Sequence, residues 1–196
     1  MANDSIAAHF ERSRAALDTV ASDRALLETI GACAATITAA LRNGGKLLIA
    51  GNGGSAADAQ HIAAELVGRY KRERAALPAI ALTTDTSALT AIGNDYGFDE
   101  VFARQLRALG RPGDVLLAIS TSGRSPNILA AIAAAREMDI AVIGFTGGGG
   151  GDMRALCRHW LGAPGGETAV IQQIHMVAAH AICDAVELAL MGAEGA

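Results

Sequence analysis

Apolar positions along the chain follow two different spacings, and the change between them marks the predicted elements. Residues 5–43 carry apolar side chains three and four positions apart, which predicts two helices joined near Ala21–Asp23. Asn43-Gly44-Gly45 ends the second helix, as glycine commonly does. After it, short apolar runs typical of buried strands alternate with helical patterns. The predicted strands cover 46–50, 79–83, 115–119, 140–145 and 159–163, and the predicted helices cover 55–70, 86–94, 98–109, 126–138 and 168–191.

This alternation predicts an α/β fold in which helices flank a doubly wound parallel sheet. We expect one domain over residues 1–196, with 1–44 as a helical segment for oligomerisation and 45–196 as the core built on the sheet. The glycine tract 147–151 follows a predicted strand and is interpreted as a flexible loop.

Composition and charge narrow the class of protein. Of the 196 residues, 51% are hydrophobic and 18% are charged, so the chain can bury a sizeable core and is not disordered. The low charged fraction favours an oligomer. A net charge of −4 argues against nucleic acid and against a membrane surface as partners, because both attract a surplus of cations.

The N-terminal sequence and the cysteines indicate the compartment. MANDSIAAHFERSR has no apolar segment, so no signal peptide is expected. Asp184 and Glu187 interrupt the long apolar run near the C-terminus, which leaves it short of a membrane span. Cys33, Cys157 and Cys183 are odd in number and lack CxxC spacing, so we expect reduced cysteines in the core. The chain is therefore expected to be cytoplasmic.

A glycine-rich turn, GNGGSA at 51–56, follows the first predicted strand. Ligands of open parallel sheets bind beyond the carboxyl ends of the strands, which makes this turn a candidate site. Ser55 is suited to cap the next helix and to bind an oxyanion. The turn also fits the dinucleotide pattern GxGxxA, but the acid at the end of the next strand is Asp85, 34 positions after Gly51. That pattern requires about 20, so a nucleotide site is the weaker interpretation.

A second turn, STSGRSPN at 120–127, follows the predicted strand VLLAI. Four hydroxyl groups lie within six residues, and Pro126 suits the first position of a helix. Hydroxyls, backbone N–H groups and a helix dipole together favour a phosphomonoester over a simple serine cap.

Histidines and a carboxylate are spaced along two predicted helices. His61 and Glu65 are four residues apart, so both project from one helix face. The C-terminal helix carries Gln172, His175 and His180 on an otherwise apolar sequence, where a single histidine is more often a hydrogen-bonded core residue. His61, Glu65 and His180 together supply two imidazoles and a carboxylate, which suits zinc or a similar divalent ion. The spacing leaves metal binding and metal-free acid–base chemistry both open.

Three long motifs resemble the sugar isomerase (SIS) fold, and more closely the phosphoheptose isomerases: GNGGSAADAQHIAAEL, LTTDTSALTAIGNDYGFDEVF and ISTSGRSPNI. The resemblance covers nearly the whole chain and implies a flavodoxin-like three-layer sandwich. It also implies one Zn²⁺ per subunit, held by His61, Glu65, Gln172 and His180. The substrate contacts expected from the resemblance and the turns are Asn52, Gly53, Gly54, Ser55, Glu65, Asn94, Asp95, Ser120, Thr121, Ser122, Ser125 and Gln172. His175 matches a family histidine outside the metal set and is expected to be structural.

The resemblance further implies an aldose–ketose interconversion. A base removes a proton from the carbon beside a carbonyl, and the enediolate is reprotonated at the neighbouring carbon. Glu65 is the implied base, His180 the acid that serves the sugar oxygens, and zinc the electrophile. The implied substrate is sedoheptulose 7-phosphate, held by its phosphate at 120–125, and the implied product is D-glycero-D-manno-heptose 7-phosphate for lipopolysaccharide synthesis. Ala169 and Gln173 stand where the family usually has acids, which affects contacts with the sugar tail.

The spacing of the implied ligands predicts a site shared between chains. Gln172 and His180 lie about 12 Å apart along a straight helix, whereas zinc ligands lie about 2.0–2.3 Å from the ion. At least one ligand is therefore expected from a neighbouring protomer, unless the chain bends near Gln172. The homotetramer implied by the resemblance would place active sites at subunit interfaces. Mixing the inactive variants Glu65→Gln and His180→Ala would test this expectation. Activity should partly return if the two residues serve one site from different chains, and no recovery would place them on the same chain.

Two other functions fit such a fold. A SIS-fold relative acts as a homotetrameric adaptor that binds the replication initiator DnaA, a role that predicts degraded metal and base positions. A sugar-phosphate-sensing module usually accompanies a second domain, for which this chain has no room. Zinc in near-stoichiometric amount would favour the enzyme. The basic stretch Arg69, Lys71, Arg72 and Arg74 is interpreted as a solvated helix end that at best attracts an anionic substrate.

Overall fold

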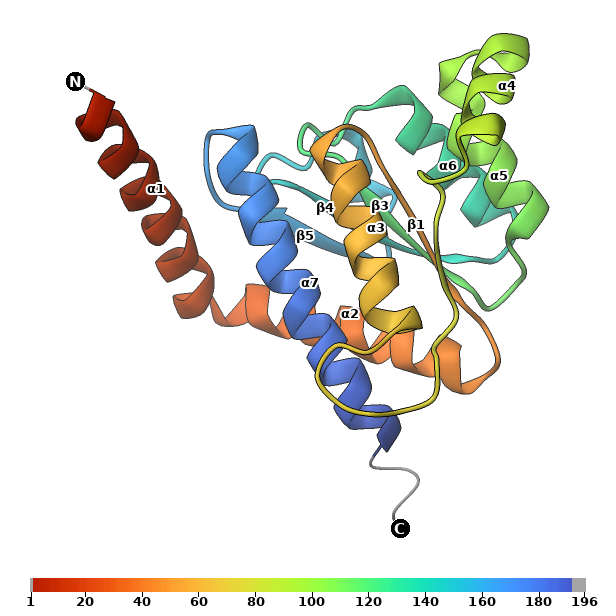
Figure 1. Ribbon diagram of the computed structural model, residues 1–196, viewed down its shortest axis with the longest axis horizontal. Helices are drawn as coiled ribbons and strands as arrows, with labels where there is room; N and C mark the ends of the chain where they lie inside the picture. The colour runs from red at the N-terminus through yellow and green to blue at the C-terminus, as the bar shows by residue number, and fades with distance from the viewer. Residues whose placement is uncertain (1, 192–196) are drawn as a thin grey trace.

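Five parallel strands form the centre of the computed structural model, which describes residues 2–191 (Figure 1). The strands are β1 (Leu47–Gly51), β2 (Ala79–Ala81), β3 (Val115–Ile119), β4 (Ala141–Gly147) and β5 (His159–Ala163). Their order in the sheet is β2-β1-β3-β4-β5, so β2 is added on one side of β1 and the later strands are added on the other side. In sheets of this order, ligands bind beyond the carboxyl ends of the two strands where the direction changes, here β1 and β3.

Helices cover both faces of the sheet, as the sequence predicts. One face carries α1 (Ala2–Ser22), α2 (Arg24–Arg42), α3 (Gly54–Val67) and α7 (Thr168–Met191). The other face carries α4 (Thr86–Tyr96), α5 (Val101–Leu109) and α6 (Pro126–Glu137), with the short 3-10 helices η1 (Phe98–Glu100) and η2 (Gly151–Ala155) in the connections. Figure 1 shows α3 and α7 side by side in front of the strands, and α1 extending away from the body of the molecule.

Side chains along a strand alternate between two hydrophobic cores, one on each face of the sheet. Leu47 and Ile49 of β1 pack under the helices of one face, and Leu48 and Ala50 pack under those of the other. Because all of β1 and β3 is buried, these strands have continuous apolar sequences instead of alternating ones. The three-layer prediction is therefore confirmed.

The boundary between the two N-terminal helices lies where it was predicted. Asp23 caps α2 by accepting a hydrogen bond on its side chain from the backbone N–H of Leu26, at 3.0 Å. After α2 the chain turns at Gly44, whose φ of +77° favours glycine.

The glycine tract after β4, which the sequence predicts to be a flexible loop, is packed in part against the serine turn. Gly123 has a φ of +66°, and a Cβ there would lie 2.1 Å from the carbonyl oxygen of Gly150. The carbonyl of Gly123 in turn accepts backbone N–H groups of Asp152 and Met153. The glycines therefore allow two backbone segments to approach closely, and the tract supports the turn after β3.

Among the described residues, α2 and α7 are long and apolar enough to cross a membrane by length and composition alone. Both belong to the packed layer over the sheet, where they contact each other. Core helices of soluble proteins have the same length and composition, so this feature is weak evidence for a membrane span.

The basic stretch does not form a solvated helix end. Helix α3 ends at Val67, and residues 69–74 lie in the loop that leads to β2. Arg74 leaves only 6% of its side chain exposed because it packs against the carboxylate of Glu187. Tertiary contacts with α7 thus override the local pattern of charges.

Candidate active site

The two predicted ligand-binding turns lie next to each other at the carboxyl ends of β1 and β3. Gly51 and Ile119 are paired in the parallel register, so the turns that follow them begin side by side. Between the turns and the start of α7 is a hollow of about 270 Å³. Its lining contains Asn52, Gly53, Gly54, Ser55, Ile119, Ser120, Thr121, Ser125, Thr168 and Gln172. Most of the predicted substrate contacts therefore surround one cavity.

The first turn brings its backbone close to α7 through its glycines. Gly53 has a φ of +57° and precedes the first residue of α3. A Cβ on Gly54 would lie 2.6 Å from Nε2 of Gln172, so a larger residue at this position would require the glutamine side chain to move. Ser55 lies inside α3 and is buried, and the N-terminus of that helix has no side-chain cap. The prediction that Ser55 caps the helix is wrong, because the helix begins one residue earlier.

The hydroxyl groups of the second turn gather as expected for an anion site. Ser120 Oγ lies 2.9 Å from Ser125 Oγ and 3.4 Å from Ser122 Oγ. Ser125 occupies the N-cap position of α6 without capping it, and Pro126 follows at the first helical position. The positive end of the helix dipole and a cluster of hydroxyls thus lie together beside the hollow.

An amide pair that the sequence analysis missed joins the two turns. Asn52 Nδ2 donates to Asn127 Oδ1 at 2.8 Å, and Asn127 Nδ2 donates to Asn52 Oδ1 at 2.9 Å. Asn127 is 2% exposed, so its amide needs such a partner. The pair holds Asn52 at the edge of the cavity. The only sequence signal for Asn127 was a polar residue just inside a predicted helix.

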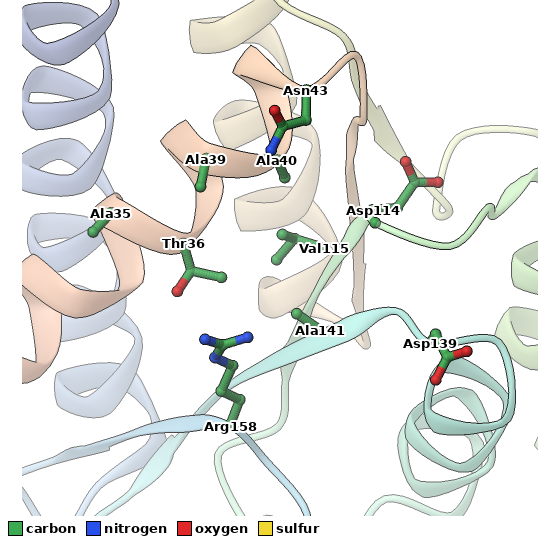
Figure 2. Close-up of a pocket in the computed structure, with 11 residues that line it drawn as sticks. Ala35, Thr36, Ala39, Ala40, Asn43, Asp114, Val115, Asp139, Ala141 and Arg158 are labelled. Atoms are coloured by element: carbon green, nitrogen blue, oxygen red, sulfur yellow. The ribbon is translucent and has the colours of Figure 1, made fainter.

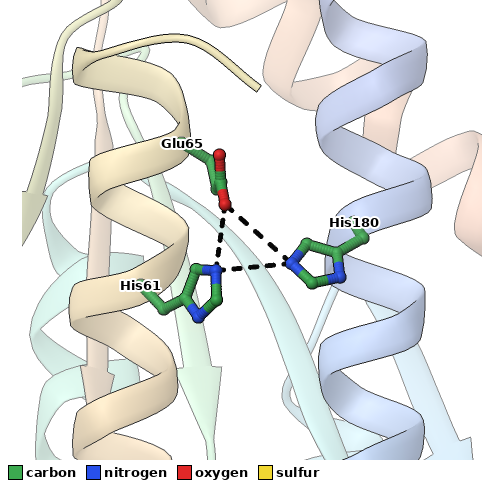
Figure 3. Close-up of side chains that lie close together, drawn as sticks. All are labelled: His61, Glu65 and His180. Carbon is green, nitrogen blue, oxygen red and sulfur yellow. Dashed lines mark hydrogen bonds and ion pairs between the residues drawn. The ribbon is translucent and has the colours of Figure 1, made fainter. Parts of the chain in front are cut away.

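His61, Glu65 and His180 form a second part of the site, between α3 and α7 (Figure 3). His61 Nε2 lies 2.9 Å from Glu65 Oε1, and His180 Nε2 lies 3.4 Å from His61 Nε2. His180 Nε2 is 4.0 Å from the same carboxylate oxygen. All three side chains are partly exposed, so the cluster faces solvent-accessible space.

These distances fit a metal site. Ligands bound at about 2.0–2.2 Å in a tetrahedral arrangement lie roughly 3.3–3.6 Å from one another. The three donor atoms lie 2.9, 3.4 and 4.0 Å from one another, a range that brackets this spacing. Two imidazoles and one carboxylate with an open fourth position are also the donor set of many catalytic zinc sites. The chain's own residues therefore fit zinc.

The structure brings Glu65 and His180 together within one chain. Within one chain α3 packs beside α7, so one face of α3 meets His180 directly. Gln172, eight residues earlier on the same straight stretch of helix, lies over Gly54 and lines the hollow. Three of the four predicted ligands thus gather in one chain, and Gln172 is placed with the substrate cavity.

Asn94 and Asp95 are not brought to this cavity. Both lie exposed on α4, where Asn94 Nδ2 donates to Asp95 Oδ1 at 2.8 Å. Helix α4 packs on α5 over the opposite face of the sheet from α7 (Figure 1). Asp85, the acid considered for a nucleotide ribose, instead caps α4 by accepting the N–H of Ala88. The weaker nucleotide interpretation therefore finds no support at this residue.

His175 is a core residue, as expected. It is 1% exposed, and its Nε2 lies 3.0 Å from the carbonyl oxygen of Thr146, to which it donates. Burial lowers the pKa of His175 to about 4, although the hydrogen bond to Thr146 opposes this shift. Trp160 Nε1 donates to the hydroxyl of the same threonine. His175 is therefore neutral at physiological pH and ties α7 to β4.

A larger hollow of about 440 Å³ lies at the opposite end of the strands, near their amino ends (Figure 2). It is bounded by α2 and by the amino ends of β3 and β4, and the guanidinium of Arg158 points into it. None of the predicted site residues lines it. Because ligands of doubly wound sheets bind at the carboxyl ends of strands, the smaller cavity is the candidate active site.

Known proteins with similar sequences show the family to which this chain belongs. The family model of the SIS domain matches residues 8–147, so the chain belongs to the SIS domain family. It is 65% identical over 190 residues to a phosphoheptose isomerase of a Bradyrhizobium strain, which covers 97% of this chain and 96% of the relative. Within the SIS domain family, the chain is thus one of the phosphoheptose isomerases.

Solved structures agree with this assignment. The phosphoheptose isomerase GmhA of Neisseria gonorrhoeae superposes with a TM-score of 0.89 and 48% identity, over 95% of this chain and 99% of that one. A phosphoheptose isomerase of Francisella tularensis gives a TM-score of 0.90 and 41% identity, over 95% and 98% of the two chains. The fold and the isomerase class predicted from the sequence are therefore confirmed.

Proposed function

We propose that this chain is a zinc-dependent isomerase that converts sedoheptulose 7-phosphate to D-glycero-D-manno-heptose 7-phosphate. The observation that carries the proposal is the placement of the His61, Glu65 and His180 cluster on the two helices that border the hydroxyl-lined cavity. A sugar phosphate has two ends with different chemistry, and the site offers two matching parts.

The serine turn holds the phosphate in this proposal. Ser120, Ser122 and Ser125 present hydroxyls to it, and the N-terminal end of α6 adds a favourable dipole. Gln172 and the backbone of Gly53 lie along the cavity and contact the sugar chain. The carbonyl end of the substrate then lies toward His61 and Glu65.

Glu65 takes the proton from the carbon beside the carbonyl and returns it to the neighbouring carbon. Glu65 contacts both histidines through Oε1, so Oε2 is the oxygen proposed to accept this proton. His180 moves a proton between the two sugar oxygens as the carbonyl changes place. When bound by His61, Glu65 and His180, zinc supplies an electrophile for the negative charge on the enediolate oxygens.

The proposed site includes residues that a single chain does not bring to the cavity. Asn94 and Asp95 contact substrate only if an oligomer brings α4 of a neighbouring chain to the cavity, and we propose a homotetramer with active sites at subunit interfaces. Ile6 and Phe10, exposed on the outward-extending α1, offer apolar surface for it. We further propose a cytoplasmic enzyme that makes the first intermediate of nucleotide-activated heptose for lipopolysaccharide.

The adaptor that binds DnaA is the second candidate. A protein of that kind would not need the ligand spacing at His61, Glu65 and His180, and the preserved spacing favours the isomerase.

Two measurements test the proposed function together. Purified protein should contain about one zinc ion per chain and should interconvert the two heptose phosphates. Glu65→Gln keeps the shape of the side chain but cannot accept the proton, so turnover should fall by at least about 10²-fold. Glu73→Gln, in the exposed part of the next loop, is the matched control and should keep wild-type turnover. Absence of turnover in the zinc-loaded wild type, or normal turnover in Glu65→Gln, would refute the proposal.

A further inference from the structure

The loop between α3 and β2 is fixed to α7 by a carboxylate with no solvent exposure. Glu187, 0% exposed, accepts backbone N–H groups of Tyr70, Lys71 and Arg72 at 2.8, 3.1 and 3.1 Å. Burial alone would raise the pKa of Glu187, but these bonds and the charge of Arg74 hold it below its usual value. Glu187 is therefore an ionised anchor for the loop.

Arg74 links this anchor to the end of α3. Its Nε lies 3.2 Å from Glu187 Oε1, and its side chain is 6% exposed. Its guanidinium also donates to backbone carbonyls at the end of α3, at 2.8 Å to Glu65 and 2.9 Å to Leu66. The same arginine thus contacts the backbone of Glu65 and a carboxylate on α7.

Tyr70, in the same loop, contacts His180 of the proposed metal site. Its ring stacks on the ring of His180, with centroids 5.4 Å apart and planes inclined by 19°. Such stacking restricts the rotation of an imidazole about its side-chain bonds. His180 and Glu187 are seven residues apart on α7, so they lie on one helix face and the loop spans the distance between them.

We propose that Tyr70, Arg74 and Glu187 are positioning residues for the His61, Glu65 and His180 cluster. Glu187 and Arg74 set the separation of α3 and α7, and Tyr70 sets the ring plane of His180. This inference rests on the proposed function, since it assigns these residues to the proposed zinc site. Groups that orient metal ligands typically change metal affinity or activity by 10- to 100-fold when removed.

The test measures zinc affinity directly, by competition with a chromogenic chelator, alongside kcat and KM. Tyr70→Leu removes the ring from a partly exposed position, and Glu187→Gln removes the charge with little change of shape. Both should weaken zinc binding by about 10- to 100-fold and lower kcat, while KM stays near the wild-type value because the serine turn is distant from the loop. Tyr70→Phe keeps the ring and should retain wild-type zinc affinity.

A matched control separates positioning from loss of stability. Asp114 forms a second buried ion pair, 2.6 Å from Lys46 Nζ and 2% exposed, and it also accepts backbone N–H groups of Lys46 and Arg111. It lies at the amino end of β3, so Asp114→Asn should lower thermal stability and leave zinc affinity unchanged.

The inference is overturned if Tyr70→Leu binds zinc within twofold of the wild type, or if Asp114→Asn weakens zinc as much as Glu187→Gln. Should Glu187→Gln fail to fold, Tyr70→Leu against Tyr70→Phe still decides the matter. Failure of the proposed function is a separate result, seen as a wild type that neither binds zinc nor isomerises the sugar.

Discussion

The histidines on α3 and α7 have different roles because their surroundings differ. His61 and His180 leave 51% and 35% of their side chains exposed and face a carboxylate, so they can exchange a ligand or a proton. His175, five residues before His180, is buried between α7 and the sheet and donates to a backbone carbonyl. Five residues of helix turn the side chain to another side, so His175 faces the core while His180 faces the proposed metal site.

The burial of His175 makes stability depend on pH. Its pKa is about 4 in the folded protein and about 6.5 in an unfolded chain. Between these values the unfolded state binds more protons, so the free energy of unfolding falls as pH falls from about 6.5 to 4.

We expect His175→Gln to reduce this dependence, because glutamine can donate to the carbonyl of Thr146 but does not titrate. Between pH 7 and pH 5 the wild type should lose about 2 kcal/mol more stability than the variant. Urea unfolding at the two pH values measures the difference. Equal losses in both proteins would show that His175 does not titrate in this range.

At the scale of elements, the turn after β3 owes its shape to a neighbouring turn. Gly123 fits against Gly150 only because neither residue has a side chain there. This contact holds Ser120 and Ser125 in the arrangement where their hydroxyls meet at 2.9 Å. A turn already arranged in this way would bind the proposed phosphate with little further cost in chain entropy.

Replacing both Ser120 and Ser125 with alanine should therefore act mainly on KM. In the proposed function the hydroxyls contact a phosphate that does not react, so they would stabilise ground state and transition state alike. Hydrogen bonds to a charged group contribute roughly 1.5–3 kcal/mol each, so KM should rise by at least about 10-fold with kcat little changed. Steady-state kinetics with the heptose phosphate measures both, and Ser87→Ala on the exposed surface of α4 is the control. A fall in kcat with KM constant would contradict a phosphate-binding role.

For the whole molecule, the residues of one active site can come from one chain or from two neighbouring chains. The proposed base and acid lie on α3 and α7 of one chain, whereas Asp95 lies on α4 over the other face of the sheet. In the proposed homotetramer, a neighbouring chain supplies Asp95.

Mixing inactive variants shows whether two residues serve a site from the same chain or from different chains. Hybrids of Glu65→Gln with Asp95→Ala should regain up to about a quarter of wild-type activity, since some sites then combine intact groups from two chains. Hybrids of Glu65→Gln with His180→Ala should regain none, because both residues serve the site from the same chain. Activity assays after dissociation and reassembly measure both. Recovery in the second pair alone would overturn the assignment of chains.

The sequence by itself determined the order of the elements and the chemistry of the turns. Continuous apolar runs arise because strands of a central parallel sheet are buried on both faces, and this signal is local enough to place β1 and β3. The serine turn and the spacing of His61 and Glu65 are local as well, since one turn or one helix face fixes them.

Only the tertiary structure decided how separate segments meet. The Asn52–Asn127 pair, the packing of Gly150 on Gly123 and the burial of Arg74 by Glu187 all join residues far apart in sequence. The meeting of Glu65 and His180 within one chain depends likewise on α3 lying beside α7. Periodicity reports how each segment faces the core, but it carries no information about which segment packs opposite, and these contacts depend on that packing.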